Sequence, residues 1–151
     1  MNIVPPISDF REIIMKTQAS FAPKNSLILV LDPSAGDIPN SMARQLVAST
    51  PSCIAVGTMS ASDGETMVVL TDDKQCLDFN PTMQRVFEGF IDTPRMEVSV
   101  CTVDIEPILS LRVSAKRTGV EVWVNHEREP NRVYVLIIAG NLGKSGDTIL
   151  I

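Results

Sequence analysis

Acidic side chains gather in the middle of this 151-residue chain, where they could hold a cation or a positively charged protein. Residues 63–106 contain ten acidic and three basic side chains, whereas the flanking segments are neutral or slightly basic. A segment of this charge repels nucleic-acid phosphates and attracts basic proteins. We therefore predict a basic protein partner rather than a nucleic acid, with Asp63, Glu65, Asp72 and Asp73 as the partner-binding residues.

A calcium or small-ligand site is the alternative use of such carboxylates, because calcium prefers oxygen ligands. Besides Asp63, the carboxylates near predicted strand ends are Asp32, Asp37, Asp72, Asp73 and Asp104. Their spacing does not match the helix–loop–helix calcium motif, so several loops would have to converge. The plainest interpretation is a solvated acidic face. We assign no residue to a metal or a cofactor.

The stretch SASDG, residues 60–64, separates two apolar runs at 53–59 and 65–71. A short loop that contains Asp-Gly is typical of a β-hairpin, because glycine readily adopts the positive φ that such turns need. We therefore predict that Asp63 and Gly64 form a hairpin turn.

Residue types that support catalysis are scarce. His126 is the only histidine, and it lies in the polar stretch NHEREPN, which favours an exposed turn over a general base. Gly143, Lys144 and Ser145 resemble the end of a P-loop, but Ile138 stands where that motif requires its first glycine. We therefore predict a protein that is not an enzyme.

The three cysteines are too widely spaced for a zinc cluster. Their odd number, and an N-terminal stretch unlike a signal peptide, indicate reduced thiols and a cytoplasmic location. Cys53 and Cys101 lie in apolar stretches and are expected in the core. Cys76 lies near Asp73 and Asp78, which disfavours its thiolate and a nucleophilic role.

Hydrophobic patterning predicts a mainly β fold. In several runs apolar and polar residues alternate with a period of two, and turns separate these runs, which is typical of an antiparallel β-sandwich. We predict a single domain over residues 1–151, with an amphipathic helix over 7–21, a β-sandwich over about 26–138 and a tail over 139–151. About eight strands are expected, at 26–31, 53–59, 65–71, 84–91, 97–103, 108–114, 119–125 and 132–138, with a short helix over 41–50.

Trp123 lies in an alternating run in which Val120, Val122 and Val124 share one face. If the valines point to the core, Trp123 points out of it. We expect it to lie beneath the helix at 7–21; a partner-binding surface is the alternative. No apolar run reaches the ~18 residues that cross a bilayer, so we predict no membrane partner.

The order of the strands carries a resemblance. CIAVGTMSASDGETMVVL is followed by VFEGFIDTPRMEVSVCTV and then by ILSLRVSAKRTGVEVWVNHEREPNRVYVLI. This pattern, over about residues 40–138, resembles small bacterial β-sandwich proteins similar to competence protein J. The resemblance implies inhibition of a DNA-entry nuclease, and it carries over no functional residue.

We therefore predict a non-enzymatic protein-binding module that inhibits or regulates a basic partner such as a nuclease. Acidic inhibitors associate rapidly with cationic active sites. Exposed edge strands would also permit a homodimer.

Overall fold

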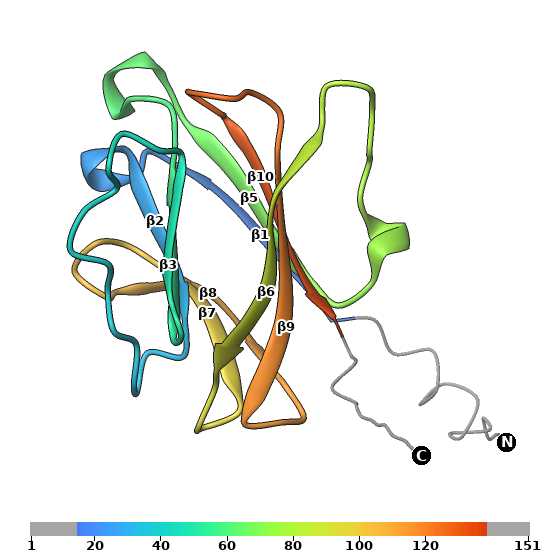
Figure 1. The fold of residues 1–151 in the computed structure, drawn as a ribbon. Coiled ribbons are helices and arrows are strands. Elements are labelled where there is room, and N and C mark those ends of the chain that lie inside the picture. Colours follow the sequence, from blue (N-terminus) through green and yellow to red (C-terminus); the bar gives the residue numbers. More distant parts are fainter. Residues whose placement is uncertain (1–14, 139–151) are drawn as a thin grey trace, which may run out of the picture.

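Ten β-strands and three short 3-10 turns make up residues 15–138, the part of the chain that the computed structural model describes (Figure 1). The strands are β1 (Lys16–Phe21), β2 (Leu27–Leu31), β3 (Val47–Thr50), β4 (Cys53–Gly57), β5 (Thr66–Thr71), β6 (Gln84–Asp92), β7 (Glu97–Cys101), β8 (Pro107–Arg112), β9 (Arg117–Val124) and β10 (Arg132–Ile138). The 3-10 turns are η1 (Lys24–Ser26), η2 (Ala61–Asp63) and η3 (Lys74–Cys76). Within these residues no helix is long and apolar enough to cross a membrane.

The strands form two five-stranded sheets. Sheet A has the order β1-β5-β10-β9-β6, and sheet B has the order β3-β4-β2-β7-β8. All neighbouring strands are antiparallel except β5 and β10, which run parallel with Val69 opposite Tyr134. The mainly β prediction is therefore confirmed, whereas antiparallel pairing throughout is wrong for this central pair.

The main core lies between the two sheets. Alternate residues of each strand point inward, as the period of two predicts. Val120, Val122 and Val124 of β9 are all fully buried in this core, together with Val68 and Leu70 of β5. Valine, isoleucine and leucine supply nearly all of it, which fits a chain with few aromatic residues.

Long connections cover the outer faces of both sheets. Residues 32–46, between β2 and β3, place Ile38 and Met42 against a cluster on the outer face of sheet B. Residues 72–83, between β5 and β6, do the same for sheet A with Leu77, Phe79 and Met83. Both faces of the central strands are therefore buried, which explains continuous apolar runs such as LILVL in β2.

The predicted helix over residues 7–21 is wrong for its second half, because residues 16–21 form β1. Thr17, Ala19 and Phe21 turn inward and the residues between them are exposed, so this stretch also has a period of two. Pairing with β5 satisfies its backbone and decides between the two patterns. The rest of the predicted helix lies outside the described residues.

The predicted helix over residues 41–50 is also wrong. Val47–Thr50 forms β3 at the edge of sheet B, where Ala48 pairs with Ala55 of β4. A β-branched residue at each end of this short stretch favours a strand, and β4 offers a free edge.

Trp123 points out of the main core, as predicted, but residues 72–83 cover it rather than an N-terminal helix. The rings of Phe79 and Trp123 meet edge to face, with their centroids 4.6 Å apart. The ring of Phe79 also meets that of Tyr134 edge to face, with a centroid distance of 5.8 Å. The missing information was the path of the β5–β6 connection, which packs over β10 and β9, the two strands that lie between the ones it joins.

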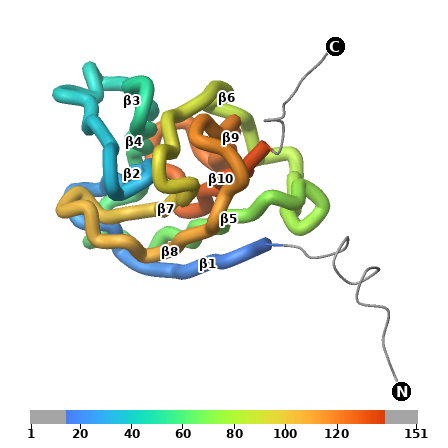
Figure 2. Tube along the Cα trace, turned by 90° about the horizontal axis from the view of Figure 1, so that it is seen from below, coloured from blue at the N-terminus to red at the C-terminus, as the bar shows by residue number. Residues whose placement is uncertain are grey.

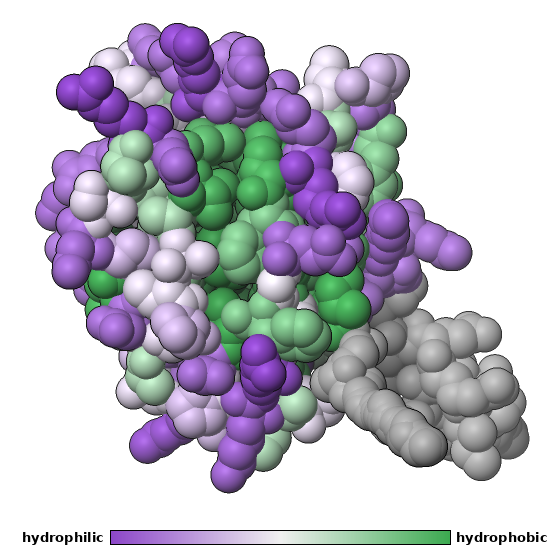
Figure 3. Space-filling view, viewed as in Figure 1, coloured by the Kyte–Doolittle hydropathy of each residue, from purple (hydrophilic) through white to green (hydrophobic). Residues whose placement is uncertain are grey.

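The two sheets meet differently along their two sides (Figure 2). β1 of sheet A lies beside β8 of sheet B, whereas β3 and β6 on the other side are more widely separated (Figures 1 and 2). Apolar side chains show between these two edges in Figure 3. The partly buried residues that pack on the core there are Leu46, Val47, Val86 and Phe87. This side is therefore the more open one.

Cys53 and Cys101 are fully buried, as predicted, in the cluster on the outer face of sheet B. Burial raises the pKa of Cys53 to about 12 and that of Cys101 to about 11. Cys76 is partly exposed, and its Sγ donates to Asp73 Oδ2 over 3.7 Å.

We therefore expect only one of the three thiols, Cys76, to react with a chromogenic disulfide reagent in the native protein, because only thiolates react and the other two thiols are buried. Titration of the native and then the denatured protein measures this directly. Rapid reaction of a second thiol before unfolding would contradict the burial of the cluster.

Candidate protein-binding surface at one end of the sheets

Four connections meet at one end of the two sheets. They are residues 22–26, 58–65, 102–106 and 125–131, which join β1 to β2, β4 to β5, β7 to β8 and β9 to β10. Backbone hydrogen bonds hold 58–65 against two of the others, because Thr58 N donates to Ser26 O and Met59 N donates to Pro130 O, both over 2.9 Å. Connections far apart in the sequence thus form one surface.

This surface is acidic. Its six acidic side chains are all exposed: Asp63, Glu65, Asp104, Glu106, Glu127 and Glu129. Lys24 and Arg128 are its only basic side chains, and Lys24 Nζ lies 3.1 Å from Asp104 Oδ2. The three short connections at the opposite end, 51–52, 93–96 and 113–116, carry Arg95 and Lys116 and no acidic residue. We call the first surface the acidic end.

The structure divides the four predicted partner-binding residues between two places. Asp63 and Glu65 precede β5 and belong to the acidic end, whereas Asp72 and Asp73 follow β5. Six residues of strand separate the two pairs by roughly 20 Å. Asp72 Oδ1 accepts a hydrogen bond from Met15 N, and Asp73 Oδ1 accepts one from Gln75 N at the start of η3. Asp72 therefore fixes the backbone just before β1, and Asp73 caps η3.

The predicted partner-binding residues omit four members of the acidic end: Asp104, which was considered only for the calcium site, and Glu106, Glu127 and Glu129. They lie in two turns separated by about twenty residues, and no local pattern links them to Asp63. The only signal was that each occupies a short connection between predicted strands. The sheet order places these connections at one end, and that order was not predicted.

Residues 60–64 are not a hairpin turn, contrary to prediction. β4 belongs to sheet B and β5 to sheet A, so residues 58–65 cross from one sheet to the other. Gly64 has the expected positive φ, 134°, directly after η2. Ser60 Oγ accepts from Ser62 N at the start of that turn. The crossing places Asp63 and Glu65 at the acidic end.

Side chains shape the loop between β9 and β10. Asn125 Oδ1 accepts hydrogen bonds from the amides of Asn131 and Arg132, each over 3.1 Å. His126 is exposed, as predicted, and its Nδ1 accepts from the amides of Arg128 and Glu129 over 3.1 and 2.9 Å. The histidine therefore holds the loop that presents Glu127 and Glu129.

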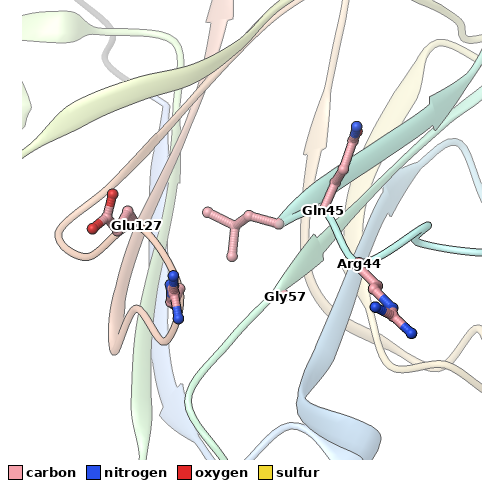
Figure 4. A pocket seen from close by; sticks show the side chains of 6 residues that line it. Arg44, Gln45, Gly57 and Glu127 are labelled. Carbon is pink, nitrogen blue, oxygen red and sulfur yellow. The ribbon is translucent and has the colours of Figure 1, made fainter.

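A cleft of about 380 Å³ opens beside this loop. Glu127 and Arg128 form one wall, Arg44 and Gln45 form the other, and Leu46 and Gly57 complete the lining. Figure 4 shows Glu127 on one side of the cleft and Arg44 and Gln45 on the other, with Gly57 between them. The cleft has the size to receive a side chain from a partner.

A loop-carboxylate calcium site finds no matching geometry in residues 15–138, where no three His, Cys, Asp or Glu side chains are grouped to hold a metal ion. The carboxylates that suggested it are scattered. Asp104 is at the acidic end, Asp72 and Asp73 follow β5, and Asp32 is buried at the far end of β2.

Comparison with known proteins gives a likeness in fold. No protein-family model and no curated protein matches the chain. The fold is similar to that of ComJ. ComJ from Bacillus subtilis is an inhibitor of the DNA-degrading activity of NucA. The matched region covers 83% of this chain and 98% of the ComJ chain, with a TM-score of 0.50 and 8% sequence identity. A second structure, crocagin biosynthetic gene J, covers 83% and 96%, with a TM-score of 0.48 and 15% identity.

The similarity to ComJ concerns the arrangement of the strands. At 8% identity it assigns no role to any residue of this chain. It agrees with the resemblance found in the order of the predicted strands.

Proposed function

We propose that this protein is a non-enzymatic inhibitor or regulator that binds a basic protein, such as a DNA-degrading nuclease, through its acidic end. The observation that carries the proposal is the convergence of six exposed carboxylates from three separate connections on one surface. The similarity of the fold to a nuclease inhibitor supports the choice of partner class.

The charge distribution suits fast association. The exposed carboxylates gathered at one end of the protein would orient that end toward a positively charged cleft before contact. Such steering raises association rates by up to several orders of magnitude at low salt. The acidic end would then cover the partner's cationic groups, while the adjoining cleft receives one side chain.

Neutralising part of the acidic end should weaken binding. The variant Asp63→Asn, Glu65→Gln, Glu127→Gln, Glu129→Gln removes four charges and keeps the size of each side chain. We expect it to bind a basic nuclease about 100-fold more weakly at low salt, mainly through slower association. Surface plasmon resonance with NucA and other purified basic DNA-degrading nucleases measures this, alongside inhibition of DNA cleavage.

The matched control removes four exposed acidic charges elsewhere, with Asp37→Asn, Asp78→Asn, Glu88→Gln and Asp92→Asn. It has the same net charge and should retain most of the affinity. A separate variant, Asp72→Asn with Asp73→Asn, tests the other predicted pair. Equal losses in test and control variants, or an affinity that does not fall between about 50 and about 300 mM salt, would reject binding through the acidic end.

A further inference from the structure

The strand β6 presents the longest free edge in the part of the chain that the structure describes. It has 9 residues and ends sheet A on the open side of the sandwich (Figure 1). On the other side the edge strands β1 and β8 lie beside each other, and the remaining edge strand, β3, has only 4 residues. A long free edge can pair with a strand of another chain unless it is protected.

The backbone of β6 offers hydrogen-bonding groups at this edge. Asp92 N donates to Pro51 O over 2.8 Å, so the backbone of Asp92 faces away from β9. Because this direction alternates along an antiparallel pair, the N–H and C=O groups of Glu88 and Phe90 also face away from β9. Those groups have no backbone partner elsewhere in residues 15–138. Pro51 at one end and a β-bulge just after Arg85 at the other confine the free edge to this stretch.

Exposed apolar side chains lie beside the free stretch, on the outer face of sheet A. Phe90 is 52% exposed and Ile138 of β10 is 37% exposed. Both are paired with Gly119 of β9, and a Cβ added there would lie 3.4 Å from the Phe90 ring and 3.2 Å from Ile138. The two side chains therefore flank the glycine closely and form one patch, which we call the Phe90 patch. Exposed apolar patches mark interaction sites.

We propose that the β6 edge binds a second copy of this chain. The two β6 strands pair antiparallel about a two-fold axis and join the two A sheets into one. Such an interface uses the same surface on both copies, so each feature of the edge acts twice. The proposal concerns the side of the sandwich and does not depend on the proposed function.

Charge selects the register of the two β6 strands. The free groups of Glu88 and Phe90 can pair with each other in three ways, with the axis at Glu88, at Gly89 or at Phe90. An axis at Glu88 sets two Glu88 side chains opposite each other, and an axis at Phe90 sets Glu88 opposite Asp92; like charges so placed are destabilising. An axis at Gly89 sets Glu88 opposite Phe90 in two symmetric pairs, each with two hydrogen bonds.

The same register brings complementary groups together. The guanidinium carbon of Arg117 lies 4.9 Å from the centroid of the Phe90 ring, so Glu88 of the second copy, opposite Phe90, approaches a cation. The two Phe90 rings become diagonal neighbours across the axis, within reach of each other. The two Phe90 patches then form one apolar stripe that is partly removed from water.

Sedimentation velocity at increasing protein concentration tests the proposal. We expect a monomer–dimer equilibrium with a Kd of about 10 μM, as for a small transient interface, measured between about 1 and about 200 μM. Phe90→Glu removes the largest side chain of the patch and sets a second carboxylate opposite Glu88 in both symmetric pairs, so it should weaken the dimer about 100-fold. The matched control, Ile108→Glu at a 37% exposed position on β8, should leave the Kd unchanged.

Charge exchange tests the register. Glu88→Lys alone should weaken the dimer about 5-fold, because the lysine approaches Arg117 of the second copy. Added to Phe90→Glu, it pairs lysine with glutamate twice and should recover about 10-fold in affinity, whereas an axis at Glu88 or Phe90 would oppose like charges. A monomer at every concentration, equal losses in Phe90→Glu and Ile108→Glu, or no recovery in the double variant would overturn the proposal.

Discussion

Replacing Asp32 by alanine is expected to lower the free energy of unfolding by about 3 kcal/mol and the melting temperature by about 8 °C. Asp32 is 1% exposed, at the end of β2. Its Oδ1 accepts from Ser34 N and Ser34 Oγ over 3.0 and 2.7 Å, and its Oδ2 accepts from Arg95 N over 2.8 Å. The alanine variant removes the buried acceptor of three part-buried hydrogen bonds at once, which costs more than losing a single exposed bond.

The charge of this carboxylate accounts for part of the effect, and its contribution depends on pH. Burial raises the pKa of Asp32, but hydrogen bonds from Ser34 and from the amides of Arg95 and Glu97 outweigh it, so the net pKa lies below the ordinary value of 3.8. A lowered folded-state pKa gives stability that is present above the unfolded pKa and lost as the pH falls through the folded one.

Asp32→Asn keeps the shape and removes the charge, so we expect a loss of about 2 kcal/mol at pH 7. The difference from the unmodified protein should shrink as the pH falls below about 4. Urea denaturation at a series of pH values measures it. Asp37→Asn, at an exposed carboxylate of the same connection, should change stability by less than about 0.5 kcal/mol. A loss for Asp32→Asn that does not vary with pH would show that its charge contributes nothing.

The strands were the most predictable part of this fold. A run such as GVEVWVN predicts a strand from its own sequence, because apolar and polar residues alternate along it. This alternation on β9 places the valines in the core. KTQASF was harder, since its spacing suits a helix when read together with the residues before it. Pairing with β5, more than forty residues away, decides its state. Tertiary context of this kind overrides a local pattern.

The candidate site was predictable only in part, for a topological reason. Asp63 and Glu65 stand close together in the sequence and were found. Glu127 and Glu129 join them because residues 58–65 cross between sheets and β10 pairs in parallel with β5. Neither feature leaves a local signal. Asp72 and Asp73 are close to Asp63 and Glu65 in the sequence, but β5 lies between the two pairs and places them at its opposite ends.

The cover over sheet B supplies the second large effect. Gly36 lies directly above Leu31, which is fully buried; a methyl group added at Gly36 would overlap the Leu31 side chain. Gly36 does not have a positive φ, so a substitution there acts through space and not through backbone strain. Gly36→Ala should therefore cost about 2 kcal/mol by overpacking, and Leu31→Ala about 3 kcal/mol by leaving a cavity.

The two changes should compensate, because the methyl group that Gly36→Ala adds fills part of the space that Leu31→Ala vacates. We expect the double variant to be about 1.5 kcal/mol more stable than the two single losses predict. Urea denaturation of the four proteins of this cycle measures the coupling, and Ala35→Ser, at the exposed neighbouring position, should be nearly neutral. Additive losses would mean that the backbone at Gly36 does not rest on Leu31. The connection over residues 32–46 would then not be the tight cover that buries Cys53 and Cys101, and those thiols should become reactive in the native protein.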